Sequence, residues 1–250
     1  MAEIGDWFNQ MPPVTRYWFA GSLGLPILCR FSLFSPNSMV LTSDFLKNLQ
    51  LWKPLTAVLY YPLTGNQGFH FLMNLYFIYN YSQRLELGYF GGRTADYVFM
   101  LLFNWLALVG IGWALGMIML MDPMVMSVIY VYCMINQDQI VSFWFGTRFK
   151  ARYLPWALFG VNFMLGGGGI SELVGILVGH LYYFVMMKYP ADQGVTLLQT
   201  PSILYNYFPN DRPTPFVPPN RPTRPVPSAP AAPTSTPTSY NWGRGRRLED

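Results

Sequence analysis

Long stretches without Asp, Glu, Lys or Arg constrain this chain more than any other feature. They lie at 17–29, 54–83, 97–121, 123–137, 153–171 and 173–187. A helix that crosses a typical bilayer needs about 20 predominantly apolar residues. Charged residues make up only 11% of the chain, whereas about 25% is usual in a soluble domain. The sequence therefore predicts a helical membrane protein. Two cysteines, Cys29 and Cys133, are too few for a disulfide scaffold.

The apolar stretches predict six transmembrane helices once the polar turn Pro62 to Gly68 is removed from the second stretch. Their expected bounds are 15–33, 69–85, 95–116, 123–137, 154–167 and 170–188. The fourth and fifth are short for a membrane span. Residues 1–14 form a cytosolic or interfacial segment, because Ile4, Trp7, Phe8 and Met11 follow a helical spacing. The external loop 34–68 mixes apolar and polar residues, which favours helices lying in the membrane surface.

Lys and Arg are distributed unevenly between the two sides of these six spans. With the N-terminus in the cytosol, 13 of them fall on the cytosolic side and 3, at Arg30, Lys47 and Lys53, on the external side. Cytosolic loops carry the excess of basic residues in membrane proteins. Both termini are therefore expected in the cytosol. The basic character of the chain follows from this topology, so nucleic-acid binding is not expected.

The C-terminal 50 residues differ in composition from the rest. Residues 201–250 hold 12 of the 21 prolines. Such a Pro-rich polar segment cannot bury enough apolar surface to fold, so residues 191–240 are expected to be a disordered linker. The chain then ends in an aromatic and basic segment, 241–248, with the residues Asn241, Trp242, Gly243, Arg244, Gly245, Arg246, Arg247 and Leu248.

Two polar side chains lie at the external end of the second span. His70 and Asn74 are four residues apart, so they share one helix face. Two donors in this position suit an oxyanion or a water-filled cavity. Alternatively, the pair is buried and joins this span to its neighbours through hydrogen bonds.

The sixth span carries two ionisable residues and a pair of glycines. Gly175 and Gly179 form a Gly-x-x-x-Gly pattern, which favours close approach of a second helix. Glu172 is either buried and neutral or an interfacial carboxylate that faces water. His180, eight residues further, is either a proton-relay group or a hydrogen-bonded interior histidine. No residue pattern indicates a metal or a cofactor.

Several of these features together resemble the rhomboid-like superfamily, and more specifically the derlins. The shared features are the six spans, Trp52-Lys53 in the first loop, the His70/Asn74 pair, Arg84-Leu85-Glu86, and Gly175-x-x-x-Gly179. Further derlin-like segments are Gly5-Asp6-Trp7-Phe8, Thr15-Arg16-Tyr17-Trp18, 96–105 and 141–146. The resemblance implies an all-α, polytopic, rhomboid-like six-helix membrane domain over 15–190, with a disordered cytosolic tail.

The resemblance also shows where this chain departs from active rhomboid proteases. Those enzymes use a serine in G-x-S-G on span four and a histidine in H-x-x-G-x-x-x-G on span six. Here Glu172 occupies the position of that histidine, and Ser127 on span four has no glycine two residues before it. A nucleophile needs a base within hydrogen-bond reach. His70 and Asn74 would then be a vestigial oxyanion-type pair in a pseudoprotease that is not an enzyme.

For function, the resemblance implies a non-catalytic role in endoplasmic-reticulum-associated degradation, in a multi-pass protein of that membrane. Derlins assist the retrotranslocation of misfolded lumenal and membrane proteins to the cytosol. The segment 241–248 resembles the SHP box, by which derlins bind the valosin-containing-protein AAA ATPase. Other implied partners are a ubiquitin-ligase complex, misfolded substrates and the lipid bilayer, with homo- or hetero-oligomers of derlins as a further possibility. The family usually has Trp-Arg where this chain has Trp52-Lys53, so bidentate pairing there is lost.

Two other functions compete with this one. An active intramembrane serine protease would need Ser127 as its nucleophile, and it predicts labelling by a fluorophosphonate. A small-solute transporter would need inverted repeats and polar residues at the midplane. No internal repeat is visible, and the transporter hypothesis leaves the tail segment 241–248 without a role.

Overall fold

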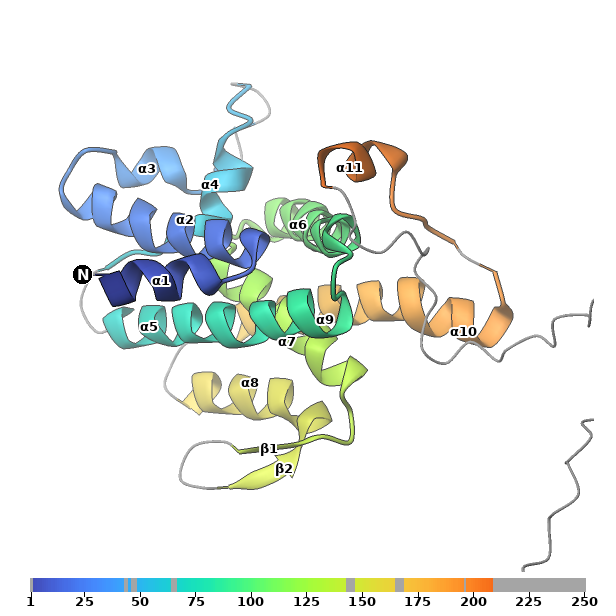
Figure 1. Ribbon diagram of the computed structural model, residues 1–250. Coiled ribbons are helices and arrows are strands. Elements are labelled where there is room, and N and C mark those ends of the chain that lie inside the picture. Colours follow the sequence, from blue (N-terminus) through green and yellow to red (C-terminus); the bar gives the residue numbers. More distant parts are fainter. Residues whose placement is uncertain are drawn as a thin grey trace, which may run out of the picture.

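The computed structural model describes residues 2–42, 45, 49–63, 67–142, 147–164, 169–195 and 197–208. This part of the chain is mainly helical, with one short two-stranded hairpin (Figure 1). The prediction of a mainly helical protein is therefore confirmed.

The first half of the chain forms α1 (Ala2–Gln10), α2 (Pro13–Arg30), α3 (Pro36–Met39), α4 (Lys53–Leu59) and α5 (Gln67–Phe77). Two π-helical turns, η2 (Ile78–Ser82) and η3 (Leu85–Tyr89), extend α5. A π-helical turn is usually a short insertion within an α-helix. The second predicted span thus belongs to a helix that starts before 69 and continues past 85.

The second half forms α6 (Thr94–Leu115), α7 (Met121–Ile135), β1 (Ile140–Ser142), β2 (Arg148–Lys150), a 3₁₀ turn η5 (Ala151–Tyr153), α8 (Leu154–Met164) and α9 (Ile170–Tyr183). The π-helical turn η6 (Phe184–Lys188) and α10 (Tyr189–Gln193) extend α9, and α11 (Ser202–Tyr207) follows. β1 and β2 pair antiparallel. Gly116 ends α6 with φ of 68°, a left-handed conformation that glycine adopts at little cost.

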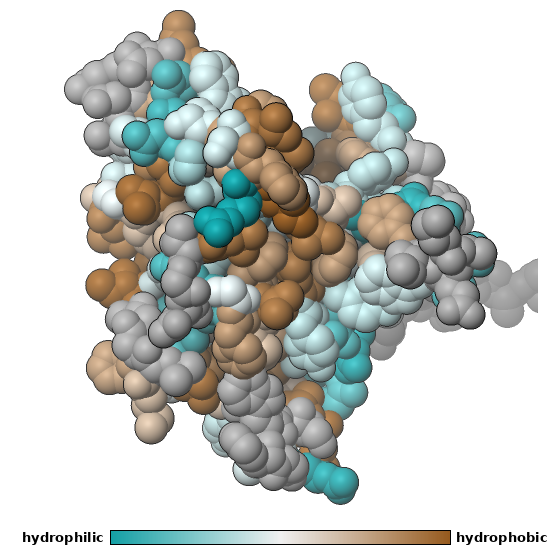
Figure 2. Space-filling view, turned by 90° about the vertical axis from the view of Figure 1, so that its left-hand side faces the viewer, coloured by the Kyte–Doolittle hydropathy of each residue, from teal (hydrophilic) through white to brown (hydrophobic). Residues whose placement is uncertain are grey.

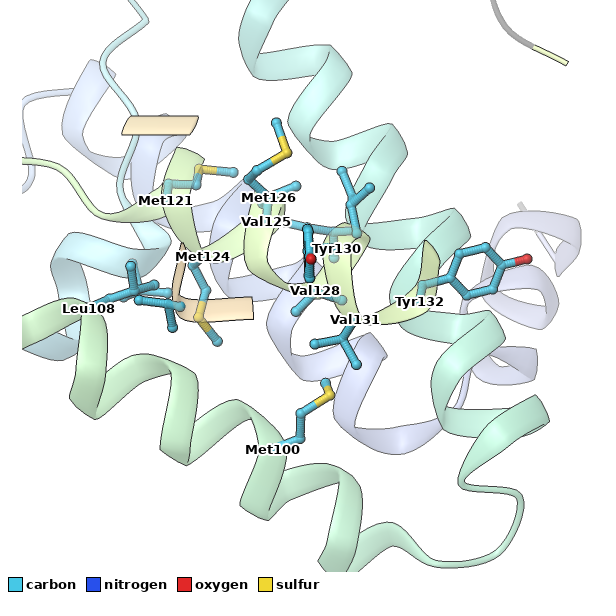
Figure 3. Close-up of a cluster of buried hydrophobic side chains, with 14 of the residues drawn as sticks. Met100, Leu108, Met121, Met124, Val125, Met126, Val128, Tyr130, Val131 and Tyr132 are labelled. Carbon is cyan, nitrogen blue, oxygen red and sulfur yellow. The ribbon is translucent and has the colours of Figure 1, made fainter. Parts of the chain in front are cut away.

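Helix α7 lies at the centre of the core. Every residue from 123 to 133 on it is buried, so it is surrounded by protein on all sides. Figure 3 shows its Met, Val and Tyr side chains pointing in several directions, with Met100 and Leu108 of α6 on one side. Its largest contact is with α9, and α4, α5, α6 and α8 also pack against it. An apolar helix that is buried all round is typical of a core position.

Large apolar side chains are exposed on the outer helices. Examples are Leu72 on α5, Leu106 on α6, Trp156 on α8 and Leu177 on α9. Figure 2 shows hydrophobic residues over much of one face, with hydrophilic residues in smaller patches. An exposed apolar surface of this extent is unusual for a soluble monomer, and it suits contact with lipid.

Among the described residues, two helices are both long and apolar enough to cross a membrane. They are α6 and the continuous helical run Ile170–Gln193, and α7 is apolar but shorter. Helices also occupy the other predicted spans, with α2, α5 and α8 at spans one, two and five. The count of six spans stays a prediction. Span one was expected to reach Leu33, but α2 ends at Arg30.

The predicted start of the disordered linker at 191 is wrong. Helix α10 continues to Gln193, and α11 forms a helix that packs against α6. The composition is polar here, but Leu204 supplies one buried apolar contact. The remainder of the expected linker and the segment 241–248 lie outside the described residues.

Candidate functional site

Six polar side chains from five segments of the chain meet near the start of α7. We call this group the polar cluster. Its members are Tyr61 after α4, His70 and Asn74 on α5, Asp122 on α7, Asn162 on α8 and Glu172 on α9. Tyr61, Asn74 and Glu172 are buried, and His70 and Asp122 are partly buried. The cluster therefore connects the ends of α5, α7, α8 and α9.

His70 lies in the middle of the polar cluster. Its Nε2 accepts a hydrogen bond from the Asn162 side-chain amide at 2.9 Å. In this amide orientation the neutral ring carries its proton on Nδ1. Nδ1 lies 2.7 Å from Tyr61 Oη and 3.5 Å from Asp122 Oδ1. Both ring nitrogens are therefore engaged with protein groups.

Asn74 and Asp122 form a short contact beside this ring. The Asn74 amide nitrogen donates to Asp122 Oδ1 at 2.6 Å and lies 3.5 Å from His70 Nδ1. The expected donor pair His70 and Asn74 thus shares one carboxylate on α7. This arrangement favours the interpretation in which the pair joins neighbouring helices, because its donors are directed at Asp122 and Tyr61 instead of at an open oxyanion position.

Asn162 continues the network to α9. Its amide nitrogen donates to Glu172 Oε1 at 2.5 Å as well as to His70. Glu172 is 3% exposed, so the alternative in which it faces water is wrong. Its other oxygen, Oε2, has no hydrogen-bond partner among the described residues. A buried carboxyl group with one unpaired oxygen is costly, so Glu172 is a candidate for a functional role.

His180 does not join the polar cluster. Its side chain is exposed, so the prediction of an interior histidine is wrong, although its Nδ1 is hydrogen-bonded to Tyr130 Oη at 2.8 Å. Phe184 stacks on the ring from one turn further along the helix. His180 thus stands on the exposed side of α9, where it contacts the buried Tyr130 of α7 and Phe184 of η6, and none of its described contacts reaches the polar cluster.

Gly175 and Gly179 lie where α9 crosses α7. A Cβ on Gly175 would stand 2.6 Å from the Pro123 carbonyl oxygen, and one on Gly179 would stand 2.7 Å from the Ser127 carbonyl oxygen. Carbon atoms do not approach backbone oxygens so closely. The two helices therefore need glycine at both positions to keep their present distance.

Ser127 is fully buried between α6, α7 and α9. Its hydroxyl donates to the Met124 carbonyl oxygen at 2.7 Å and accepts from the Asn104 amide at 3.2 Å. These contacts are those of a packing serine. His180, which Tyr130 holds at the outer surface, does not appear among them.

Trp52 and Lys53 stand at the start of α4. Trp52 is exposed, whereas the Lys53 side chain turns inward and donates to Thr42 Oγ1 at 3.2 Å. The same loop is tied to the α6–α7 connection, because the Leu120 amide donates to the Ala57 carbonyl oxygen. Lys53 thus links the start of α4 to the preceding loop at Thr42.

A second buried carboxylate, Glu86, lies on η3, at the far end of the helical run that α5 begins. In the sequence, Arg84 and Glu86 lie at the cytosolic end of the second span, which suggests loop anchors, but in the structure Glu86 binds the start of α2. Its carboxylate accepts from the Val14 and Thr15 amides at 3.0 and 2.8 Å and from Thr15 Oγ1 at 2.8 Å. Pro12, the N-cap residue of α2, offers no side-chain cap. A distant carboxylate therefore satisfies the free amides of this helix.

Sequence reasoning missed three members of the polar cluster. Asp122 separated two charge-free stretches, so it was treated as the boundary of a span. Tyr61 and Asn162 are single polar residues in apolar surroundings. Asn162 and Asp122 could have been found from their position, because a polar residue inside or beside a span usually has a polar partner. Among the described residues, no group of three or more His, Cys, Asp or Glu is placed to hold a metal ion.

Comparison with known proteins gives a consistent result. A family model described as the Der1-like family matches residues 11–202. Derlin-1 of Homo sapiens is 52% identical over 214 residues, which cover 85% of this chain and 85% of that protein. Derlin-1 of Caenorhabditis elegans is 54% identical over 210 residues (84% and 86%), and Derlin-1 of Drosophila melanogaster is 40% identical over 211 residues (83% and 85%). The family match spans every residue of the polar cluster, and the chain belongs to the Der1-like family.

Proposed function

We propose that this chain is a non-catalytic component of endoplasmic-reticulum-associated degradation, located in the endoplasmic reticulum membrane. In this role it assists misfolded lumenal and membrane proteins on their way to the cytosol. Its similarity to proteins named Derlin-1 supports this class of function. The proposed topology has six spans and both termini in the cytosol, in agreement with the 13 to 3 distribution of basic residues.

The observation that carries the proposal is the shortness of two helices beside longer ones. At 1.5 Å per residue, the 22 residues of α6 span about 33 Å, the 15 residues of α7 about 22 Å, and the 11 residues of α8 about 16 Å. The hydrocarbon core of a bilayer is about 30 Å thick. Because α7 is surrounded by protein, α8, with Trp156 and Phe163 exposed, is the short helix that can thin the bilayer around it. A thinner hydrocarbon layer lowers the barrier to the passage of a polar polypeptide beside α8.

Lengthening α8 tests this mechanism. Four leucines inserted between Leu158 and Phe159 would add about 6 Å to the helix. We expect slower export of a misfolded lumenal substrate from microsomes. The matched control is the same insertion in the middle of α6, which already has the length of a span. Normal export by a folded variant with a long α8 would contradict the thinning mechanism.

The second part of the proposal is recruitment of the valosin-containing-protein AAA ATPase by residues 241–248. An aromatic anchor with neighbouring arginines is typical of short binding motifs. A flexible tether raises the local concentration of the ATPase at the membrane. A ubiquitin-ligase complex and other derlin copies are proposed as further partners.

Capture of the ATPase by the full-length chain tests the recruitment. Detergent-solubilised wild-type protein, immobilised on beads, should retain purified ATPase. The affinity of Trp242→Ala for the ATPase should be at least tenfold lower, because truncating a main anchor costs about 2 kcal/mol or more of binding free energy. Tyr240→Ala, just outside the segment, is the control. Equal capture by wild type and Trp242→Ala would refute this role of the segment.

The contacts of Ser127 support the non-catalytic assignment, because its hydroxyl is buried and paired with Met124 and Asn104. A fluorophosphonate probe should leave the wild-type protein unlabelled. Labelling that disappears in Ser127→Ala would instead favour the protease hypothesis.

A further inference from the structure

The chain that follows the last long helix returns to α6 and is held there by one carboxylate. Asp96 lies in the first turn of α6 and is 3% exposed. Its Oδ1 accepts from Thr200 Oγ1 at 2.6 Å and from Tyr205 Oη at 2.9 Å. Figure 1 shows α11 beside α6, and its contacts lie at the start of that helix, about 100 residues earlier in the chain. We call this contact the α11 clamp.

Among the described residues, α11 has few other buried contacts. The helix has six residues, and isolated helices shorter than about 12 residues are marginal in water. Leu204 is its buried residue, whereas Ser202, Ile203, Asn206 and Tyr207 are exposed. The helical state of this segment therefore depends on Leu204 and on the two hydrogen bonds to Asp96.

Thr200 also carries the features of a phosphate acceptor. It is followed by Pro201, and a threonine directly before proline is the minimal substrate pattern of proline-directed protein kinases. Residues 198–201 have no helix or strand, and both neighbours of Thr200 are exposed. Pro201 has φ of −57° and ψ of 138°, which is an extended backbone. Kinases bind their substrates as extended segments, so only release of the hydroxyl from Asp96 is needed.

We propose that Thr200 is a phosphorylation site for a proline-directed kinase, and that its modification opens the α11 clamp. The proposal rests on the cytosolic placement of this face that was proposed above. In the reaction, Thr200 Oγ1 attacks the γ-phosphorus of ATP. The bond between that phosphorus and the β,γ-bridging oxygen breaks, ADP leaves with this oxygen, and the hydroxyl proton passes to the catalytic base of the kinase.

Two effects of the phosphate act in the same direction. The esterified Oγ1 has no proton, so it no longer donates to Asp96. A phosphate adds a charge of about −1.5 to −2 near a buried carboxylate, and like charges at this distance repel. Opening the clamp frees residues 197–208 to join the tail. The tether of the terminal segment 241–248 then starts near the end of α10 instead of at α6.

Hydrogen exchange of the purified full-length protein in detergent tests the clamp. We expect Thr200→Glu and Asp96→Ala to raise exchange of the amides of 202–208 about tenfold or more, since a hydrogen bond to a charged group contributes on the order of a tenfold change in an equilibrium. Ser202→Glu is the matched control, because it adds the same charge two residues away at an exposed position. Exchange should stay within about twofold of wild type in this control.

Phosphorylation by a purified proline-directed kinase tests the site. The kinase should modify Thr200. It should do so faster in Asp96→Ala, because the closed α11 clamp and the phosphorylation of Thr200 exclude each other, so weakening the clamp favours the phosphorylated state. Equal exchange in Thr200→Glu and Ser202→Glu would overturn the clamp. Slower exchange after phosphorylation would overturn the opening of the clamp, because it would mean that the phosphate pairs with Arg93. Absence of phosphate on Thr200 in Asp96→Ala would overturn the phosphorylation site. These readouts do not involve the ATPase, so they fail or succeed independently of its recruitment.

Discussion

Substituting Gly175 by alanine should push α7 and α9 apart, which make the most extensive helix–helix contact among the described residues. The new Cβ would lie 2.6 Å from the Pro123 carbonyl oxygen and 2.7 Å from Met126 Cβ, both on α7. Ordinary contact begins at 3.4 Å, so α7 and α9 would have to move apart by roughly 0.8 Å. A gap of about 0.5–1 Å forfeits a quarter to a half of the dispersion energy across a contact. Neither partner atom can swing away, because one is backbone and the other is a Cβ.

The expected cost is about 1–3 kcal/mol of unfolding free energy, the usual range for added atoms in a packed core. Alanine is the better helix former by about 0.5–1 kcal/mol, and this gain partly offsets the strain. Gly160→Ala in α8 and Gly110→Ala in α6 isolate that gain, because a Cβ at either position meets nothing within 4 Å. These controls should be neutral or stabilised.

Unfolding in mixed detergent micelles with increasing sodium dodecyl sulfate, followed by tryptophan fluorescence, measures these differences. We expect the midpoint of Gly175→Ala to fall below that of wild type and the midpoints of both controls to stay at or above it. If Gly175→Ala unfolds with the controls, then α7 and α9 do not depend on this glycine for their distance.

Three further outcomes follow from the contacts described above. Asn162→Leu should lower the unfolding free energy by about 1–3 kcal/mol, because it removes a donor from the buried Glu172 carboxyl. The double variant Asn162→Leu/Glu172→Leu should lose less, since removing both partners leaves no unpaired group. A larger loss for the double variant in the same unfolding assay would contradict this account. Glu86→Gln should lower stability by about 1 kcal/mol, because the first amides of α2 lose a charged cap, and a midpoint equal to wild type would refute the capping role. The Lys150 ammonium, 2.9 Å from Asp138 Oδ1, holds the pKa of Asp138 below its ordinary value. The ion pair should therefore persist at neutral pH and break only when the pH falls through this lowered pKa. An NMR titration in which Lys150→Met leaves the Asp138 pKa unchanged would exclude the pair.

The sequence predicts the helices better than it predicts their contacts. Apolar stretches bounded by charges locate α6, α7 and α9 within a few residues, because lipid and core both demand such stretches. The four-residue spacing of His70 and Asn74 also places them on one helix face. Their partner Asp122 could not be assigned from spacing, because it is 48 residues from Asn74 in the sequence. Only packing of α5 against α7 brings the two together.

Composition misleads at both ends of the membrane domain. The segment after α10 is polar and was expected to lack structure, yet Leu204 and the two bonds to Asp96 order α11. Glu86 follows an arginine near the end of a span, which suggests a loop anchor. Its actual partner is a helix start that begins with Pro12 and Pro13 and has no cap of its own. Neither contact leaves a local signal in the sequence.

The Glu86 cap also affects the order in which the protein can mature on the ribosome. The residues it joins are separated by 71 positions, and chains grow at about 5–20 residues per second, so roughly 4–14 s pass between synthesis of Thr15 and synthesis of its acceptor. During that interval the start of α2 must be solvated by water at the membrane surface or held by another factor. If translation stops between residues 30 and 86, α2 is complete but Glu86 is not yet there to cap it. The packing of α2 against the other helices is then still reversible. The carboxylate of Glu86 thus becomes available to cap α2 only after α2 itself has been synthesised.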